Sequence, residues 1–324
     1  MREVPSIPRD SDFRDLIKDS IPFKISGYTS DDLGSCLEEW KPERLSSILS
    51  ERRVSVHVSS EPNLNFVAKN FKYEYMTFSD LFWRIKESQK CLNGDREYLY
   101  YRSLGERPRK DPSNLSSVHP YLEETFKLPA EISRILDDSS SSIHSTVFRI
   151  SQPGVELWTH YDALDNFLVQ IHGSKLVILF PPSTLHKLSI TDTSSPYRNI
   201  CKLDMDSANS ELLSAYKLAY KTVLNPGDVL FIPAAWSHGI HSLFPEDDSE
   251  EIKTCISVNL FFSDGQVEYA SKNVYGNEDP APMKRACDLL QKDFLNLSLQ
   301  LPVHLQKAFW SKVASISLQY LNNL

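Results

Sequence analysis

Short strand-like segments follow one another closely between residues 145 and 262, and they constrain the fold more than any other feature of the sequence. They are rich in β-branched and aromatic residues and are separated by Gly or Pro turns. We expect these strands at residues 146–150, 156–162, 167–172, 175–180, 229–233, 236–242 and 253–262. Gly173-Ser174 fits a two-residue hairpin turn with glycine first. The pattern favours a mainly β fold with flanking helices, a double-stranded β-helix of the jelly-roll and cupin kind.

The flanking parts of the chain carry helical patterns as well as strands. We expect helices over residues 11–20, 42–49 and 77–86. We expect strands over residues 21–27, 54–58 and 98–102. Apolar side chains recur at helical spacing over residues 281–299 and again beyond Pro302, which predicts two amphipathic helices. These helices either pack onto their own chain or form a homodimer interface, because periodicity does not say whose core a stripe enters. We divide the chain into an N-terminal part, a β core and a C-terminal helical, dimerising region, at residues 1–97, 98–265 and 266–324.

Composition excludes several classes of protein. At 324 residues with 41% hydrophobic side chains, the chain is long and apolar enough for a sizeable core. The five cysteines are widely spaced and form no CxxC pair, which favours reduced thiols over a disulfide framework or a zinc knuckle. No apolar run approaches the length that spans a bilayer, and the first residues lack the apolar stretch of a signal peptide, so we expect a soluble cytoplasmic protein, with a nuclear location as the alternative. The net charge of −8 gives no general attraction to nucleic acid, so such binding requires a local basic patch.

His160 and Asp162 are two residues apart in an expected strand, where alternate side chains point to one face. If a second strand brings His238 alongside, two histidines and one carboxylate bind one side of a metal ion and leave open positions, as in non-haem Fe(II) oxygenases. His241 lies in the same strand as His238, but an odd separation puts it on the opposite face, so we choose His238. We interpret the remaining histidines as ordinary surface or hydrogen-bonded residues, in particular His57, His144, His172 and His241.

Lys175 begins one of the expected strands. A lysine at the end of a strand is usually solvated or protects the strand from aggregation. If Lys175 instead points inward on the face of Val177 and Leu179, burial of an unpaired ammonium is very unfavourable and requires a bound anion. A carboxylate of 2-oxoglutarate is then the natural partner.

Several motifs together resemble a known family. They are Phe148-Arg-Ile, Trp158-Thr-His-Tyr-Asp162, Asp165-Asn166, Lys175, Gly227-Asp-Val-Leu-Phe-Ile-Pro233 with Trp236 and His238, and Val258-Asn-Leu-Phe261. With them, residues 98–262 resemble the Jumonji-C (JmjC) 2-oxoglutarate oxygenases of the small hydroxylase branch. The resemblance implies a dioxygenase that uses Fe(II), 2-oxoglutarate and O2. The implied Fe(II) ligands are His160, Asp162 and His238. The implied 2-oxoglutarate contacts are Tyr100, Asn166, Lys175 and Asn259.

Segments outside the metal motif narrow this resemblance. Residues 69–71, 100–111, 147–151 and 275–280 resemble the members of the family that hydroxylate the wybutosine base of tRNA(Phe). That likeness implies the tRNA(Phe) anticodon loop as substrate and a homodimer formed through the C-terminal helices. The candidate phosphate contacts are Arg102, Arg107, Arg109, Lys110 and Arg149. The alternative interpretation is that they belong to a basic loop that is simply solvated.

Two other functions use the same core. One is a protein hydroxylase or histone lysyl demethylase that acts on a peptide, although the chain lacks an evident reader or zinc domain. The other is a non-enzymatic scaffold with an inactive metal site, which the presence of all three ligands and the lysine disfavours. A basic funnel toward the metal indicates RNA, whereas an acidic or apolar groove indicates a peptide. Residues 183–220 and 246–251 depart from the family pattern, so the substrate is less constrained than the fold.

Overall fold

The computed structural model describes residues 1–91, 96–138, 142–190, 192–197, 209–245, 251–263, 265, 267–270 and 272–323. The chain forms two compact units, which comprise Met1–Gln266 with Lys272–Asn277, and Val267–Ser271 with Glu278–Leu324. The first unit holds both β-sheets and the second is mainly helical. The division of the chain at residues 97 and 265 stays a prediction. The acidic segment 246–250 and residues 198–208, a part of the segment 183–220, lie outside the described residues.

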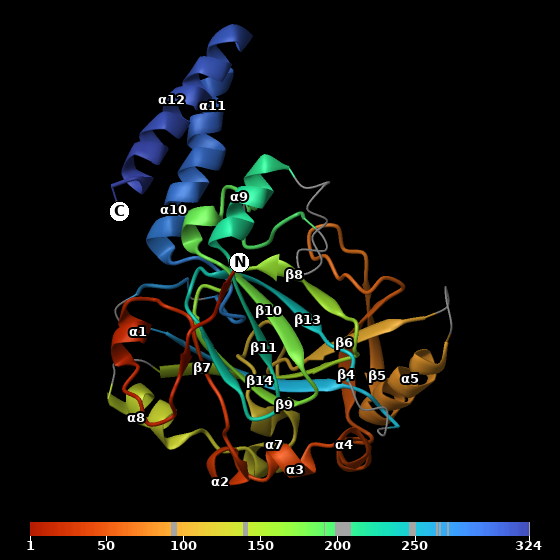
Figure 1. Cartoon of the computed structure of the whole chain (residues 1–324). Helices are drawn as coiled ribbons and strands as arrows, with labels where there is room; N and C mark the ends of the chain where they lie inside the picture. The colour runs from red at the N-terminus through yellow and green to blue at the C-terminus, as the bar shows by residue number, and fades with distance from the viewer. Residues whose placement is uncertain are drawn as a thin grey trace. The chain divides into compact units, whose positions relative to one another are not determined.

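Two β-sheets build the first unit (Figure 1). The five-stranded sheet has the order β1 (Arg2–Glu3), β11 (Tyr220–Leu224), β10 (Lys175–Phe180), β13 (Ser237–Ser242), β8 (Glu156–His160). The nine-stranded sheet has the order β2 (Ser6–Ile7), β3 (Phe23–Ile25), β12 (Val229–Ile232), β9 (Asp165–His172), β14 (Cys255–Ser263), β7 (Ser142–Ser151), β6 (Tyr98–Arg102), β4 (Arg53–Ser59), β5 (Lys72–Thr77). Leu168 of β9 and Leu179 of β10 belong to one buried cluster, so the inner faces of the two sheets pack together. The predicted mainly β fold with flanking helices is confirmed.

Side-chain alternation gives each sheet an inner and an outer face. In β9, Phe167 and Val169 belong to the outer apolar cluster, whereas Leu168 belongs to the cluster between the sheets. The same alternation holds along β10 and β14. Three buried polar side chains share the phase of the inner residues, namely Asn166, Lys175 and Asn259. The strands therefore direct these polar groups into the space between the sheets.

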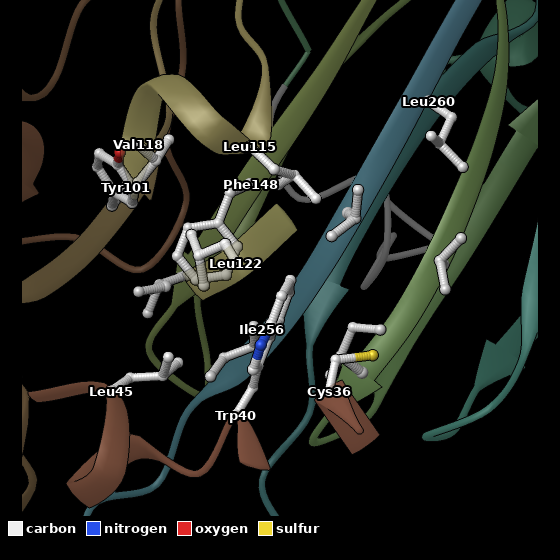
Figure 2. Packing of buried hydrophobic residues seen from close by; sticks show 14 of the residues in the cluster. Cys36, Trp40, Leu45, Tyr101, Leu115, Val118, Leu122, Phe148, Ile256 and Leu260 are labelled. Carbon is white, nitrogen blue, oxygen red and sulfur yellow. The ribbon is translucent and has the colours of Figure 1, made fainter. Parts of the chain in front are cut away.

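Short helices cover the outer face of the nine-stranded sheet. They are α1 (Arg14–Lys18), α2 (Ser30–Leu33), α3 (Cys36–Glu39), α4 (Pro42–Ile48), α5 (Phe78–Lys90), α6 (Leu115–Val118), α7 (Pro120–Thr125) and α8 (Ala130–Asp138). Figure 2 shows Trp40, which follows α3, close to Phe148 of β7, and their ring centroids are 5.2 Å apart in an edge-on contact. Complete burial of such a side chain stabilises the fold by roughly 1.5–3 kcal/mol. On the five-stranded sheet, α9 (Ser210–Leu218) packs against β10.

Two local expectations are wrong. β9 and β10 belong to different sheets, so Gly173-Ser174 joins the sheets and does not form a hairpin. Glycine is required there because Gly173 has a φ of 64° and an added Cβ would lie 2.4 Å from the carbonyl oxygen of Thr254. The strand expected over residues 156–162 ends at His160, so Asp162 lies in the following loop.

The second unit contains α10 (Ala281–Leu289), the π-helical turn Leu290–Phe294, α11 (Leu295–Leu299) and α12 (Val303–Leu321). The two predicted helical segments are thus confirmed. Many of their apolar side chains are exposed, including Leu289, Leu297, Leu299, Val303, Leu305, Ile316 and Tyr320. In the part of the chain that the structure describes, no helix combines the length and apolar character needed to cross a membrane.

Candidate metal centre

The three predicted metal ligands converge at one end of the five-stranded sheet. β8 and β13 are antiparallel neighbours, and their register places His160 directly opposite His238. The two imidazole centroids are 4.5 Å apart, and His238 Nε2 lies 3.7 Å from Asp162 Oδ2. One potential ligand atom from each residue lies within 4.8 Å of the others. His241, the alternative third ligand, faces Glu156 across the strands and is not part of this group.

Backbone carbonyls fix the tautomer of both histidines. His160 Nδ1 lies 2.8 Å from the carbonyl oxygen of Trp158, and His238 Nδ1 lies 3.0 Å from that of Trp236. A carbonyl only accepts, so each neutral ring carries its proton on Nδ1 and presents a lone pair on Nε2. Burial, followed by the proximity of His238, lowers the pKa of His160 to about 4, and burial likewise lowers the pKa of His238. Both imidazoles are therefore neutral at pH 7.

Asp162 is held by backbone hydrogen bonds from the loop around it. Its carbonyl accepts from the amide of Ala235 at 2.9 Å, and the amides of Tyr161 and Ala163 donate to the carbonyls of Thr193 and Gly276, each at 3.0 Å. The register between β8 and β13 also shifts between His238 and the next paired position, which is a β-bulge or irregularity. Bulges beside functional sites re-aim side chains. The carboxylate reaches the histidines through this loop rather than through strand alternation.

The four predicted 2-oxoglutarate contacts all lie on inner strand faces. Lys175 is 3% exposed, and its Nζ lies 2.5 Å from Ser257 Oγ. Burial lowers the pKa of this lysine to about 8. Asn259 Nδ2 donates to Asn166 Oδ1 at 3.2 Å, which leaves Asn166 Nδ2 and Asn259 Oδ1 buried without partners among the described residues. The hydroxyl of Tyr100 accepts a hydrogen bond from Arg149 Nη1.

A cavity of about 440 Å3 opens over His160 and Asp162. Its volume lies in the usual range for a small-ligand site. Two neutral imidazoles with Nε2 lone pairs and one carboxylate are a fitting donor set for a divalent metal, and the unpaired amide atoms and the buried ammonium fit an oxygen-rich ligand next to it. A second hollow, of about 670 Å3, is formed by residues of α1 and α8 and their neighbours and contains none of the predicted site residues.

Comparison with known proteins places the chain in a family. A model of the cupin-like domain matches residues 9–267. The human tRNA wybutosine-synthesizing protein 5 is 34% identical over 298 residues, which are 91% of this chain and 88% of that protein, and the Danio rerio protein of that name is 35% identical over 90% of this chain and 84% of its own length. The chain belongs to this cupin-like family. The Neurospora crassa tRNA wybutosine-synthesizing protein 4 is also similar, at 34% identity, over 85% of this chain and 21% of that longer protein.

Aromatic side chains line the cavity of this family member. Phe66, Tyr73 and Tyr75 were not singled out from the sequence, whereas Trp158, Tyr275 and His57 were named but not as parts of a cavity wall. Tyr73 and Tyr75 are 56% and 72% exposed, and they alternate along β5, a strand that we did not expect. The alternation of these two tyrosines is the sequence signal that could have identified this part of the cavity wall. His57 hydrogen bonds to the carbonyl of Tyr100 as an ordinary histidine does, but it also faces the cavity, and burial lowers its pKa to about 4.

The five basic residues predicted as phosphate contacts separate into two sets. Arg107, Arg109 and Lys110 are exposed in the loop after β6, as expected of a solvated segment, and Arg107 forms an ion pair with Asp111. Arg102 and Arg149 differ, because they lie on β6 and β7 and have buried Nε atoms, although Arg109 lines the same cavity. A solvated basic loop is therefore the wrong interpretation for these two.

Proposed function

We propose that this protein is an Fe(II)- and 2-oxoglutarate-dependent dioxygenase that hydroxylates the side chain of the wybutosine base in the anticodon loop of tRNA(Phe). The observation that carries the proposal is the convergence of His160, Asp162 and His238, whose potential ligand atoms lie within 4.8 Å of one another. Two histidines and one carboxylate leave coordination positions open for a cosubstrate and O2. The names of the similar proteins, which are tRNA wybutosine-synthesizing proteins, support the substrate. A cytoplasmic location fits that substrate.

Each metal-site residue has a distinct part in this scheme. His160, His238 and Asp162 hold Fe(II), which with 2-oxoglutarate and O2 supplies the oxidising chemistry that introduces a hydroxyl group into a C–H bond. The carbonyls that accept from the two Nδ1–H groups orient the rings and make them more basic ligands. The loop at Asp162 holds the carboxylate beside the two imidazoles, where it would complete the ligand set.

The inner strand faces provide the cosubstrate site. Lys175 would neutralise one carboxylate of 2-oxoglutarate, because a buried ammonium whose contact is a serine hydroxyl requires a counter-ion. The Tyr100 hydroxyl accepts from Arg149, so its own proton is free to donate to the same carboxylate. The amides of Asn166 and Asn259 have buried polar atoms to satisfy and suit the remaining oxygen atoms.

The walls of the cavity favour an RNA base over a peptide. The lining includes three arginines, Arg102, Arg109 and Arg149, whereas Asp162 is the one carboxylate among the described lining residues. A single-stranded base splayed out of its stack is recognised by aromatic faces, and the negatively charged groups on and beside it by basic side chains. These residues form a cavity with basic and aromatic walls, whereas a peptide hydroxylase would be expected to have an acidic or apolar groove.

We also propose that the protein is a homodimer through its C-terminal helices. The second unit exposes leucine, valine and isoleucine side chains along α10, α11 and α12. Large apolar side chains exposed in this number on neighbouring helical segments are expected at an interaction site.

The test of function has a cellular arm and an in vitro arm. Mass spectrometry of tRNA(Phe) from cells lacking the protein should show loss of hydroxylated wybutosine, and purified protein should form succinate with Fe(II) and 2-oxoglutarate. His160→Ala should abolish succinate formation, whereas His186→Ala, at an exposed histidine, should retain it. Wild-type succinate formation by His160→Ala would refute the metal assignment. Unchanged tRNA(Phe) would refute the substrate and favour the peptide hydroxylase.

A further inference from the structure

Two arginines stand directly opposite each other beside the metal centre. Arg102 is the last residue of β6, Arg149 lies on β7, and the antiparallel register pairs them. Like charges in directly opposed positions destabilise a β-sheet. Burial, and then the positive charge of Arg149, lowers the pKa of Arg102. The fold therefore maintains an arrangement that costs stability.

Neither guanidinium is paired with a carboxylate of the described residues. Arg149 donates to the Tyr100 hydroxyl, and Arg102 lies over the Tyr275 ring with its Cζ 5.1 Å from the centroid. The Nε atoms of both arginines are buried and have no hydrogen-bond partner in the described part of the chain. Buried donors that stay unpaired are costly. Two such groups side by side are suited to bind an anion.

The cosubstrate does not account for both arginines. In the proposed function, Lys175 already holds one carboxylate of 2-oxoglutarate, and Asp162 is a metal ligand. Lys175, Arg102 and Arg149 would then share a single carboxylate. RNA phosphates fit the exposed Arg109 and Lys110 of the loop better than a pair with buried Nε atoms. The anion that pairs with Arg102 and Arg149 must therefore belong to a molecule that binds inside the cavity.

We propose that Arg102 and Arg149 bind a carboxylate of the substrate, carried on the side chain that is oxidised. Both line the same cavity as His160 and Asp162, and a guanidinium fork matches a carboxylate with two parallel hydrogen bonds. The substrate class is then an aromatic base with an acidic side chain, the ring against the aromatic wall and the carboxylate on the arginines. This inference rests on the proposed function, because it assigns the charge to the substrate of that metal centre.

The first experiment compares tRNA(Phe) that carries the base side chain as a free acid with the same tRNA carrying its methyl ester. Wild-type protein should prefer the acid by about 10- to 100-fold in kcat/KM, the range expected for hydrogen bonds to a charged group. Arg102→Gln should reduce that preference to about threefold or less, and Arg102→Lys should keep part of it. Arg44→Gln removes one charge from a distant exposed arginine and should leave the preference intact. Equal use of acid and ester by the wild type overturns the proposal.

A second measurement separates the two possible sources of the carboxylate. The KM for 2-oxoglutarate, taken from succinate formation without tRNA, should be the same in Arg102→Gln and in wild type. A rise of about tenfold or more would assign Arg102 to the cosubstrate and overturn the proposal.

A third experiment does not depend on tRNA, so its failure is distinguishable from failure of the proposed function. Protein loaded with Mn(II) and 2-oxoglutarate under argon should bind indole-3-butyrate more tightly than its methyl ester, and Arg102→Gln should remove the difference. Without ligand, Arg102→Gln should raise Tm, because it removes a like-charge pair. A lower Tm would show a structural role for Arg102, and equal binding of acid and ester, or binding of neither, would contradict the site.

Discussion

The imidazoles of His160 and His238 face each other across neighbouring strands, with centroids 4.5 Å apart, and each Nδ1 is already engaged with a carbonyl two residues earlier in the chain. Two protonated imidazoles at this separation would repel each other. Burial keeps both rings neutral, and it lowers the pKa of His160 to about 4. The protein thus presents two free Nε2 atoms before any metal arrives.

The first prediction concerns the pH dependence of metal affinity. A metal ion competes with protons for its ligands only below the pKa values of those ligands. The affinity for Co(II) should therefore change by less than about threefold between pH 8 and 6.5. Visible absorption of bound Co(II) measures it. His160→Ala should weaken Co(II) binding by about 100-fold or more, because one of three protein ligands is removed. His186→Ala is the matched control at an exposed site. A tenfold loss of affinity already at pH 6.5 would show that the free rings are protonated there.

Lys175 should lower the stability of the ligand-free protein. Its pKa falls to about 8 on folding because the ammonium is buried, so between pH 8 and 10.5 the unfolded chain binds more protons than the folded one. Wild-type stability therefore rises with pH through this window, and the cost of burial is fully present below pH 8. Lys175→Met should be more stable than wild type by about 3 kcal/mol at pH 7, with the gap closing toward pH 10.5.

The same variant should lose the cosubstrate. The KM of Lys175→Met for 2-oxoglutarate should rise about tenfold or more, because a charge-assisted hydrogen bond is removed. Denaturant unfolding and succinate formation measure the two effects, and Lys312→Met, at an exposed lysine, is the control for both. An unchanged KM would remove Lys175 from the 2-oxoglutarate site.

The strands and the convergence of the three candidate metal ligands were predictable because both follow from local patterns. Alternation marks β9 and β10 to within two residues, and His160 with His238 follows from motif and spacing. The route of the chain was not predictable, since Gly173 with a positive φ serves a crossing between sheets as well as a hairpin. Local turn chemistry does not report which strand becomes the neighbour.

Pairings between distant segments explain what the sequence could not show. His57 faces the cavity because β4 lies beside β6, where it pairs with Tyr100. Arg102 and Arg149 are 47 residues apart and oppose each other because β6 lies beside β7. The sequence patterns place these residues on strands, but they do not report which strands become neighbours.

The basic loop after β6 should supply salt-dependent RNA affinity. Arg109 and Lys110 are exposed and form no ion pair among the described residues, whereas Arg107 is paired with Asp111. A variant that no longer neutralises one phosphate should show a slope of log K against log salt that is shallower by about 0.7–0.9. The slope for tRNA(Phe) should therefore become shallower in Arg109→Gln and Lys110→Gln, and should change less in Arg107→Gln, the matched control. Equal slopes in all four proteins would exclude this loop from RNA binding.

The last prediction concerns the C-terminal helices. Leu305 and Ile316 lie eleven residues apart on α12, so they share one helix face, and they are 44% and 48% exposed. If that face forms the dimer interface, the double variant Leu305→Glu with Ile316→Glu places four like charges in it and should convert the dimer into a monomer, as measured by light scattering. Lys307→Glu introduces the same residue about 200° around the helix from Leu305 and should leave the dimer intact. A wild-type protein that is monomeric, or a double variant that stays dimeric, would place these apolar side chains outside any interface of this kind.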